Sequence, residues 1–116
     1  MMDILEALDS VRAELSSVGI RAEVDPRDVN PPGAWIALNT IDHATVVCGG
    51  STIRTHVYLI VPDNGVAEST TQLNEMLISA LRVFDPDDST TPTTVQLPGG
   101  GNPLPALRLV IDVQTD

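Results

Sequence analysis

The sequence predicts an α+β protein, with an antiparallel or mixed sheet of four to five strands and two helices packed on one face. Residues 51–61 alternate apolar and polar side chains throughout, which is the period of a strand. Residues 1–18 and 69–84 instead repeat apolar side chains every three or four positions, as amphipathic helices do. Because no strand–helix–strand crossovers recur along the chain, a doubly wound parallel sheet is disfavoured.

The 116 residues fit one domain, 1–116. A chain of this length buries roughly two-thirds of its unfolded surface, so it needs neither a disulfide nor a metal to fold. The single Cys48 excludes an internal disulfide. No apolar run is long enough to cross a bilayer, and no charged-then-apolar leader opens the chain, so we expect a soluble protein that is not secreted.

The first predicted helix covers residues 1–18. Acidic residues crowd its first turns, where negative charge suits the helix dipole, and Gly19 follows as a C-terminal stop. We expect its apolar stripe to enter the core rather than to bind a partner helix. The stripe consists of Ile4, Leu5, Leu8, Val11, Leu15 and Val18.

Residues 20–48 are predicted to hold a short strand, a loop and one or two further strands. Residues 20–24 alternate, whereas three prolines and a glycine in residues 25–33 forbid a ladder. The runs 34–38 and 39–48 form either one bent strand or two strands leading into Gly49-Gly50.

The strand at residues 51–61 is expected to lie at the centre of the sheet. One of its faces is apolar nearly throughout and needs a cover, whereas the other is mixed, which indicates partial exposure or contact with another subunit. The apolar face comprises Ile53, Thr55, Val57, Leu59 and Val61. The mixed face comprises Arg54, His56, Tyr58 and Ile60.

The second helix is predicted over residues 69–84. Ser69 and Gln72 have the form of a capping box, although Asp63 or Asn64 offers an earlier start, and residues 85–88 are expected to end the helix. Its apolar face comprises Leu73, Met76, Leu77, Ala80, Leu81 and Phe84.

The C-terminal part of the chain is predicted to form a hairpin. Residues 89–94 are rich in threonine and proline and are expected to be mobile, residues 93–97 to form a short strand, and residues 98–103 a flexible turn. Residues 104–113 are the last strand, with the apolar Leu107, Leu109, Ile111 and Val113 on one face and Arg108, Val110 and Asp112 on the other.

The charge balance bears on the class of partner. Sixteen acidic residues outnumber six arginines, lysine is absent, and the net charge is -10. Phosphate contacts need clustered Lys or Arg, so a surface that grips nucleic acid is disfavoured. The acidity indicates either solubility or a surface past which DNA slides without adhering.

No motif predicts catalysis, a metal site or a cofactor, so we do not expect an enzyme. His43, Cys48 and His56 have neither metal-ligand spacing nor the pattern of a nucleophile and its base. The acidic residues of 85–88 lack the glycine and closing glutamate of a calcium loop. The glycines 99–101 do not join a strand to a helix, so they do not form a phosphate cradle.

Three segments after the N-terminal helix carry a family resemblance. GIRAEVDPRDVNPPGAWI (19–36) places Asn30-Pro31-Pro32 in a loop between strands, THVYLIVPD and QLNEMLISAL join a long strand to a helix, and ALRLVIDV is a C-terminal strand. Over nearly the whole chain this arrangement resembles the tail terminator, or tail completion, proteins of long-tailed bacteriophages.

The resemblance implies a small subunit that closes into a ring, expected to be a homohexamer. Such a ring caps the head-proximal end of the tail tube, stops polymerisation of the tube and joins the tail to the head–neck connector. The implied partners are other copies of the chain, the tail tube protein and the head-to-tail connector or stopper. DNA is expected to pass through the ring without specific binding. The implied location is the virion neck, after assembly in the host cytoplasm, with no cofactor and no membrane.

A ring needs two different contact surfaces on each subunit. Two other functions stay open: a head-to-tail connector or stopper protein, and a small-ligand-binding α+β module. The candidate interface residues come from the Asn-Pro-Pro loop, the central strand and the last strand. They are Asn30, Pro31, Pro32, Arg54, His56, Tyr58, Arg108 and Asp112.

Overall fold

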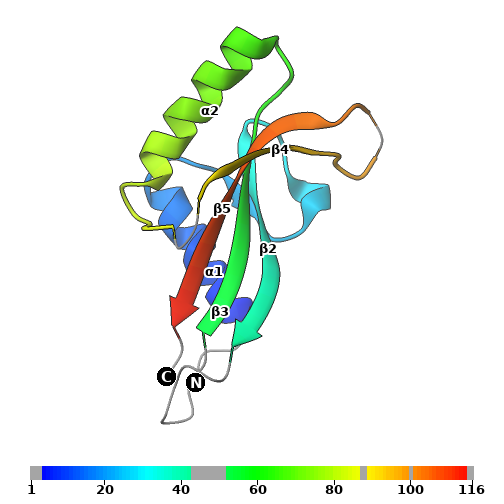
Figure 1. Ribbon diagram of the computed structural model, residues 1–116. Helices are drawn as coiled ribbons and strands as arrows, with labels where there is room; N and C mark the ends of the chain where they lie inside the picture. Colours follow the sequence, from blue (N-terminus) through cyan, green and yellow to red (C-terminus); the bar gives the residue numbers. More distant parts are fainter. Residues whose placement is uncertain (1–3, 43–51, 87–88, 100, 115–116) are drawn as a thin grey trace.

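The computed structural model describes residues 4–42, 52–86, 89–99 and 101–114 (Figure 1). Within these ranges the chain forms two α-helices, one 3-10 helix and five strands. In chain order they are α1 (Ile4–Ser17), β1 (Ala22–Glu23), η1 (Pro26–Asp28), β2 (Gly33–Asp42), β3 (Thr52–Ile60), α2 (Val66–Ala80), β4 (Thr91–Val95) and β5 (Leu104–Gln114). The expectations for His43, Cys48 and Gly49-Gly50 lie outside the described residues.

The five strands form one mixed sheet in the order β1-β2-β3-β5-β4. β1 runs parallel to β2, and all other neighbours are antiparallel. β3 pairs with β5 along its whole length, from Thr52 to Ile60, and with β2 on its other side. The predicted α+β class, the antiparallel or mixed sheet of four to five strands and the central place of the alternating strand are therefore confirmed, and the sheet is mixed with five strands.

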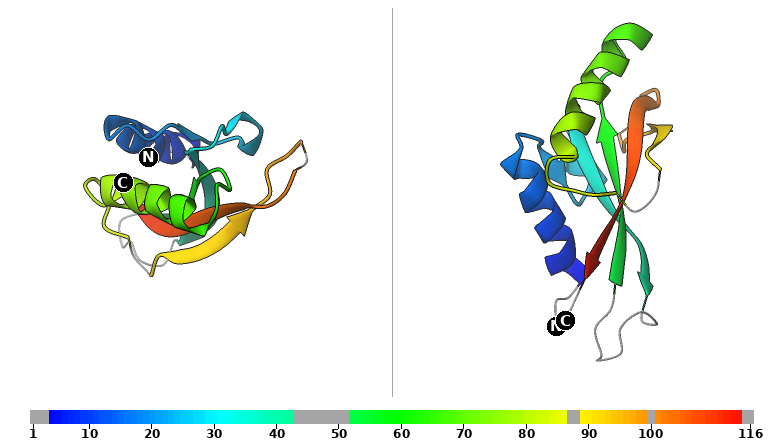
Figure 2. Two further views of the ribbon diagram at one scale, coloured as in Figure 1. Left: turned by 90° about the horizontal axis from the view of Figure 1, so that it is seen from above. Right: turned by 60° about the vertical axis from the view of Figure 1, so that its left-hand side comes forward.

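Both helices cover the same face of this sheet (Figure 2). α1 lies against β1, β2 and β3, whereas α2 lies against β3 and β5. Apolar side chains of both layers fill the space between them, and the largest of these are fully buried. They include Leu15, Ile36, Leu59 and Leu109. In the part of the chain described, neither helix is long and apolar enough to span a membrane.

The apolar stripe predicted for the first helix is correct only in its later turns. Leu8, Val11 and Leu15 are buried as expected, but Ile4 and Leu5 are 41% and 60% exposed. Ile4 opens the helix as its first described residue. Leu5 lies roughly a quarter turn away from the centre of the buried residues, at 3.6 residues per turn.

α2 begins at Val66, three positions before the predicted capping box, so that prediction is wrong. Gly65 precedes the helix with φ 92°, a left-handed conformation that glycine adopts without steric penalty. Ser69 is instead buried inside the helix. Its hydroxyl donates to the carbonyl oxygen of Pro62 (3.0 Å) and accepts from the N–H of Asn64 (3.2 Å). Ser69 therefore fastens the loop that joins β3 to α2.

The end of the second helix was also predicted too late. α2 ends at Ala80, and the N–H of Phe84 closes one further turn onto the carbonyl oxygen of Ala80 (3.0 Å). Phe84 packs against the core as expected, but Leu81 is 48% exposed. Like Leu5, it lies roughly a quarter turn from the centre of the buried residues of its helix.

The strand boundaries differ in three places. β1 has only two residues, shorter than the predicted 20–24. β2 is one strand with a register shift between Leu38 and Thr40, so of the two alternatives the bent strand is the observed one over the described residues. β4 starts at Thr91, so part of the segment expected to be mobile pairs with β5 instead.

Candidate functional site

The sheet face that points away from the helices carries polar and aromatic side chains from β2, β3 and β5. We call it the open face. Because side chains alternate along a strand, these positions lie opposite the helix-covered core. The cross-strand register sets the candidate residues in three adjacent rows, Trp35–Tyr58–Arg108, Ala37–His56–Val110 and Thr40–Arg54–Asp112, and the same alternation continues to the rows Gly33–Ile60–Ala106 and Asp42–Thr52–Gln114 at either end. Five of the eight candidate interface residues thus meet on one surface.

Arg54 and Asp112 form a two-pronged ion pair across β3 and β5. The Nε of Arg54 donates to Oδ1 of Asp112 (2.9 Å), and its Nη2 donates to Oδ2 (3.2 Å). The side chains remain 40% and 21% exposed, so water screens the attraction. Such a pair contributes at most about 1 kcal/mol to stability. Its larger effect is that the positive charge of Arg54 largely neutralises the negative charge of Asp112.

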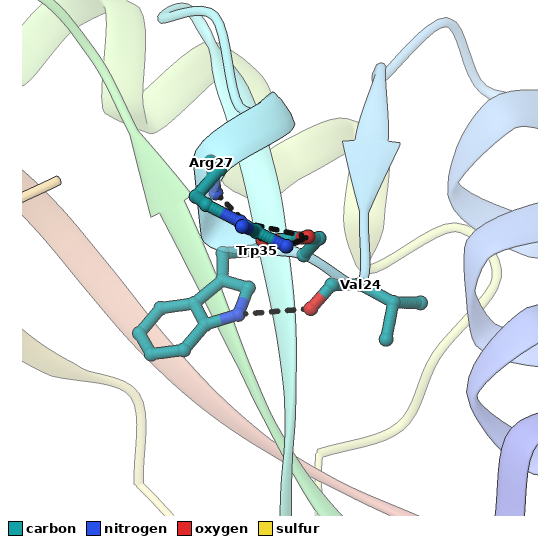
Figure 3. Close-up of polar contacts among 4 residues, drawn as sticks. Val24, Arg27 and Trp35 are labelled. Carbon is teal, nitrogen blue, oxygen red and sulfur yellow. Dashed lines mark hydrogen bonds and ion pairs between the residues drawn. The ribbon is translucent and has the colours of Figure 1, made fainter. Parts of the chain in front are cut away.

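The aromatic side chains of Trp35 and Tyr58 stack on the open face. Their ring centroids are 5.1 Å apart and their planes differ by 20°. The indole Nε1 of Trp35 donates to the carbonyl oxygen of Val24 (3.2 Å), as Figure 3 shows. An ion pair between Asp25 and Arg27 fixes the start of η1 nearby (2.9 Å). The bond to Val24 ties the stack to the β1–β2 connection.

His56 lies in the middle row, with its ring edge against Tyr58 at a centroid distance of 6.3 Å. Partial burial lowers the pKa of His56, and the positive charges of Arg108 and Arg54 lower it further. The imidazole is therefore held in its neutral form to a lower pH than a free histidine.

Arg108 lies opposite Tyr58 on one side and Thr91 of β4 on the other. Its Nε is buried and finds no hydrogen-bond acceptor among the described residues. Buried donors of this kind are rare in folded proteins because desolvation without a partner is unfavourable. Arg108 thus combines a partly exposed side chain with a buried donor that has no acceptor among the described residues.

Asn30, Pro31 and Pro32 lie in the loop between η1 and β2. Pro32 lines a surface groove of about 220 Å³ together with the end of α1 and one side of α2, including Glu75. The loop is tight at its end, because a Cβ added to Gly33 would meet the carbonyl oxygen of Asn30 at 3.0 Å. The structure thus places Pro32 on the helix side of the molecule, away from the three rows of the open face.

Within the described ranges, no three His, Cys, Asp or Glu side chains lie close enough together to share a metal ion. His43, Cys48, Asp87 and Asp88 lie outside those ranges.

Trp35 and Val110 belong to the open face but were not among the predicted site residues. Val110 was assigned to the correct face of the last strand, although its burial to 6% exposure was not foreseen. For Trp35, the alternation within residues 34–38 was the available signal. What the sequence could not supply was the register that sets Trp35 beside Tyr58.

The sequence matches no protein-family model and no curated protein.

Proposed function

We propose that this protein is a virion structural subunit: a tail terminator whose copies close into a ring on the head-proximal end of a phage tail tube. The observation that carries the proposal is the division of the sheet into two unlike faces. One is covered by both helices. The other bears an aromatic stack, an ion pair and Arg108 beside a small buried apolar cluster of Val29, Ile60, Val95 and Ala106.

The open face has the composition of an interface. Aromatic side chains and arginine are enriched where proteins meet, and this surface combines Trp35, Tyr58, Arg54 and Arg108. Contacts between copies related by rotation join two different surfaces of the same subunit, so a ring needs a second surface as well.

The helix layer offers a candidate for the second surface. Leu5 on α1 and Ile78 on α2 are 60% and 51% exposed, and Leu81 just beyond α2 is 48% exposed. Exposed apolar side chains offer a place where another protein can pack when they lie together, as Ile78 and Leu81 do at a spacing of three. In a ring, the helix layer of one copy would meet a neighbour that presents a different surface.

The acidity of the chain supports the same proposal. With a net charge of -10, a ring of these subunits repels DNA wherever its acidic groups line the channel. DNA then passes through the ring without adhering. Potential mapped onto an assembled ring tests this point, and acidic groups gathered only on the outer surface would contradict it.

The decisive experiment combines mass and position. We expect light scattering after size exclusion to give a sixfold mass, or negative-stain images to show rings, either for the chain alone or in the presence of tail tube protein. Added to polymerising tube protein, the chain should stop growth and label one end of each tube. A chain that stays monomeric with tubes present, or that binds along their sides, would contradict the proposal.

A head-to-tail connector or stopper is the rival within the same structural class. Separate binding assays with purified tubes and with purified connector distinguish the two. A terminator binds tubes in the absence of connector, whereas a stopper binds the connector and leaves tube length unchanged.

A further inference from the structure

The two outer edges of the sheet are covered by strands of the described chain at one end only (Figure 1). β1 pairs with β2 at Ala34 and Trp35, and β4 pairs with β5 from Leu104 to Arg108. Both pairings fall at the same end, because Trp35 and Arg108 share a row through Tyr58. Toward the other end, none of the described strands pairs with the outer side of β2 or β5. We call these segments the β2 edge (36–42) and the β5 edge (109–114).

The β5 edge presents backbone groups to its outer side. The carbonyl oxygen of Pro105 accepts a hydrogen bond from the N–H of Val61, so Pro105 points its backbone toward the β3 side. Because the backbone direction alternates along an antiparallel strand, Val110 and Gln114 point theirs the opposite way, to the side that β4 occupies at the covered end. An outward row of N–H and C=O groups is a template on which another strand can pair.

The β2 edge has the same property and an uncovered apolar side chain as well. The N–H of Ala34 points outward, to the carbonyl oxygen of Arg21, so that of Leu38, four positions later, does too. The side chain of Leu38 is 42% exposed, although Thr55 opposite it is fully buried. Residues 36–41 contain neither a charge nor a proline, which are the features that usually prevent pairing at an edge.

The two edges match each other in direction. β2 and β5 both run antiparallel to β3, so they run parallel to one another. When the β5 edge of one copy lies beside the β2 edge of the next, the strands are parallel and the helices of both copies stay on the same side. Repeating this step by rotation uses both edges of every copy. A two-fold pairing instead joins like edges in the antiparallel direction and leaves the other edge open.

The helices and the bend in β2 support the same contact. α1 packs on the β2 side of the sheet and α2 on the β5 side, so the joint sets α2 of one copy beside α1 of the next. Each of these helices carries a large exposed apolar side chain, Ile78 on α2 and Leu5 on α1. The extra residue Asn39 bends β2, and bends of this kind let a sheet curl toward closure.

We infer that the β5 edge of each copy pairs with the β2 edge of the next copy in a parallel ladder, so that the sheet continues from subunit to subunit. A second copy is the occupant because the two edges of this chain complement each other, whereas a strand of another protein would fill one edge and leave the other open. That the joined copies close into a ring rests on the proposed function. The pairing of the edges does not.

Hydrogen exchange tests the joint without assuming its register. Amides are labelled in dispersed copies and in the assembly formed alone or with tube protein, and are then read by NMR after dissociation. We expect the amides of Leu38, Val110 and Gln114 to exchange about tenfold more slowly in the assembly, the effect of one added hydrogen bond. The amide of Thr94, which points outward from β4 opposite Pro105, should keep its rate. Protection of one edge alone would overturn the joint, because it indicates pairing of like edges or a strand of another protein.

Proline substitutions at matched edge positions separate the joint from the fold. Leu38→Pro and Gln114→Pro each remove an outward N–H and no bond to β3, and Thr94→Pro does the same on the outer side of β4. We expect sedimentation velocity to show that the first two variants self-associate about tenfold more weakly than the wild type, whereas Thr94→Pro assembles normally. Circular dichroism checks that each variant folds, and lysine at the same position replaces proline in any variant that does not.

An equimolar mixture of Leu38→Pro and Gln114→Pro tests the direction of the joint. The first variant keeps its β5 edge and the second keeps its β2 edge, so together they should form a dimer that grows no further. If either variant dimerises alone, like edges pair with each other and the head-to-tail joint is overturned.

The outcomes distinguish the joint from the ring. Assembly of all three proline variants as in the wild type would overturn the joint and leave the ring standing. An open filament joined through both edges would support the joint and overturn the ring. Copies that stay single with tubes present, with no added protection at either edge, would overturn both.

Discussion

The hydroxyl of Thr55 donates a 2.9 Å hydrogen bond to the carbonyl oxygen of Ile111, its cross-strand partner in the centre of the sheet. Thr55 is fully buried on the helix-covered side of β3. It is a polar residue in an otherwise apolar row, and this bond satisfies its donor. The pair thus joins β3 and β5 through a side chain as well as through the backbone.

Replacing Thr55 with valine should destabilise the protein by about 1 kcal/mol, because valine keeps the branched shape and removes the donor. Urea unfolding followed by circular dichroism measures the change. Thr70→Val, at an exposed position of α2, is the matched control and should change stability by less than about 0.5 kcal/mol. A Thr55→Val protein as stable as the wild type would show that the added methyl group offsets the lost bond.

Ser69→Ala should destabilise the protein by roughly 1–2 kcal/mol, since it removes a donor to Pro62 and an acceptor for Asn64. Alanine favours a helix more than serine does, so the control must share that gain. Ser10→Ala, at an exposed site in α1, does so and should be neutral or slightly stabilising. Similar unfolding midpoints for both variants would mean that the Ser69 hydroxyl does not hold the loop.

Leu15→Ala and Leu5→Ala make the same chemical change in the same helix, one at a buried position and the other at an exposed one. Leu15 is fully buried and Leu5 is 60% exposed. The first substitution should destabilise the protein by about 2–5 kcal/mol through lost burial and a cavity, and the second by less than about 1 kcal/mol. Thermal or urea unfolding separates them easily. Comparable losses would place Leu5 in the core and contradict the observed packing.

The lowered pKa of His56 predicts a pH dependence with a definite sign. The folded state disfavours the proton relative to the unfolded chain, so the stability due to neutral His56 is complete above about pH 6.5 and falls as the pH drops toward the lower folded pKa. The charged groups in neighbouring rows are Arg54, Arg108 and Asp112, while Ala37 on β2 adds no charge.

His56→Gln does not titrate at this position, so its stability relative to the wild type should improve as the pH falls from 7.5 to 5. Urea unfolding at each pH gives the difference, and His43 contributes equally to both proteins. A constant difference across that range would contradict the lowered pKa.

The sequence predicted the features that depend on the spacing of apolar residues along the chain. It missed those that depend on the exact angle of a residue around its helix axis or on its neighbour across the sheet. The alternation of residues 51–61 identified β3 because a period of two has only one structural solution there. Leu5 and Leu81 were misplaced because a spacing of three or four tolerates residues at the margin of the buried stripe. Ser69 resembled a cap in the sequence, but the positive φ of Gly65 started the helix earlier.

In the candidate site, too, the sequence predicted which face a residue is on but not which residues it neighbours. The alternation separated Arg108, Val110 and Asp112 from the core side of β5, and it did the same for Arg54, His56 and Tyr58 on β3. Which of these residues become neighbours depends on strand order and register, which are long-range properties. The pairing of Arg54 with Asp112, the stacking of Trp35 on Tyr58 and the unpaired, buried Nε of Arg108 therefore emerged only from the structure.

The register shift at Asn39 makes β2 tolerant of a change that strands normally resist. Leu38 pairs with Thr55 and Thr40 with Arg54, so Asn39 is one residue more than the ladder needs. Losing a single residue from a strand usually turns every later side chain to the wrong side. Excision of Asn39 alone would leave Ile41 opposite Ile53, so this is the position where natural variants of the chain can differ in length without reversing the strand.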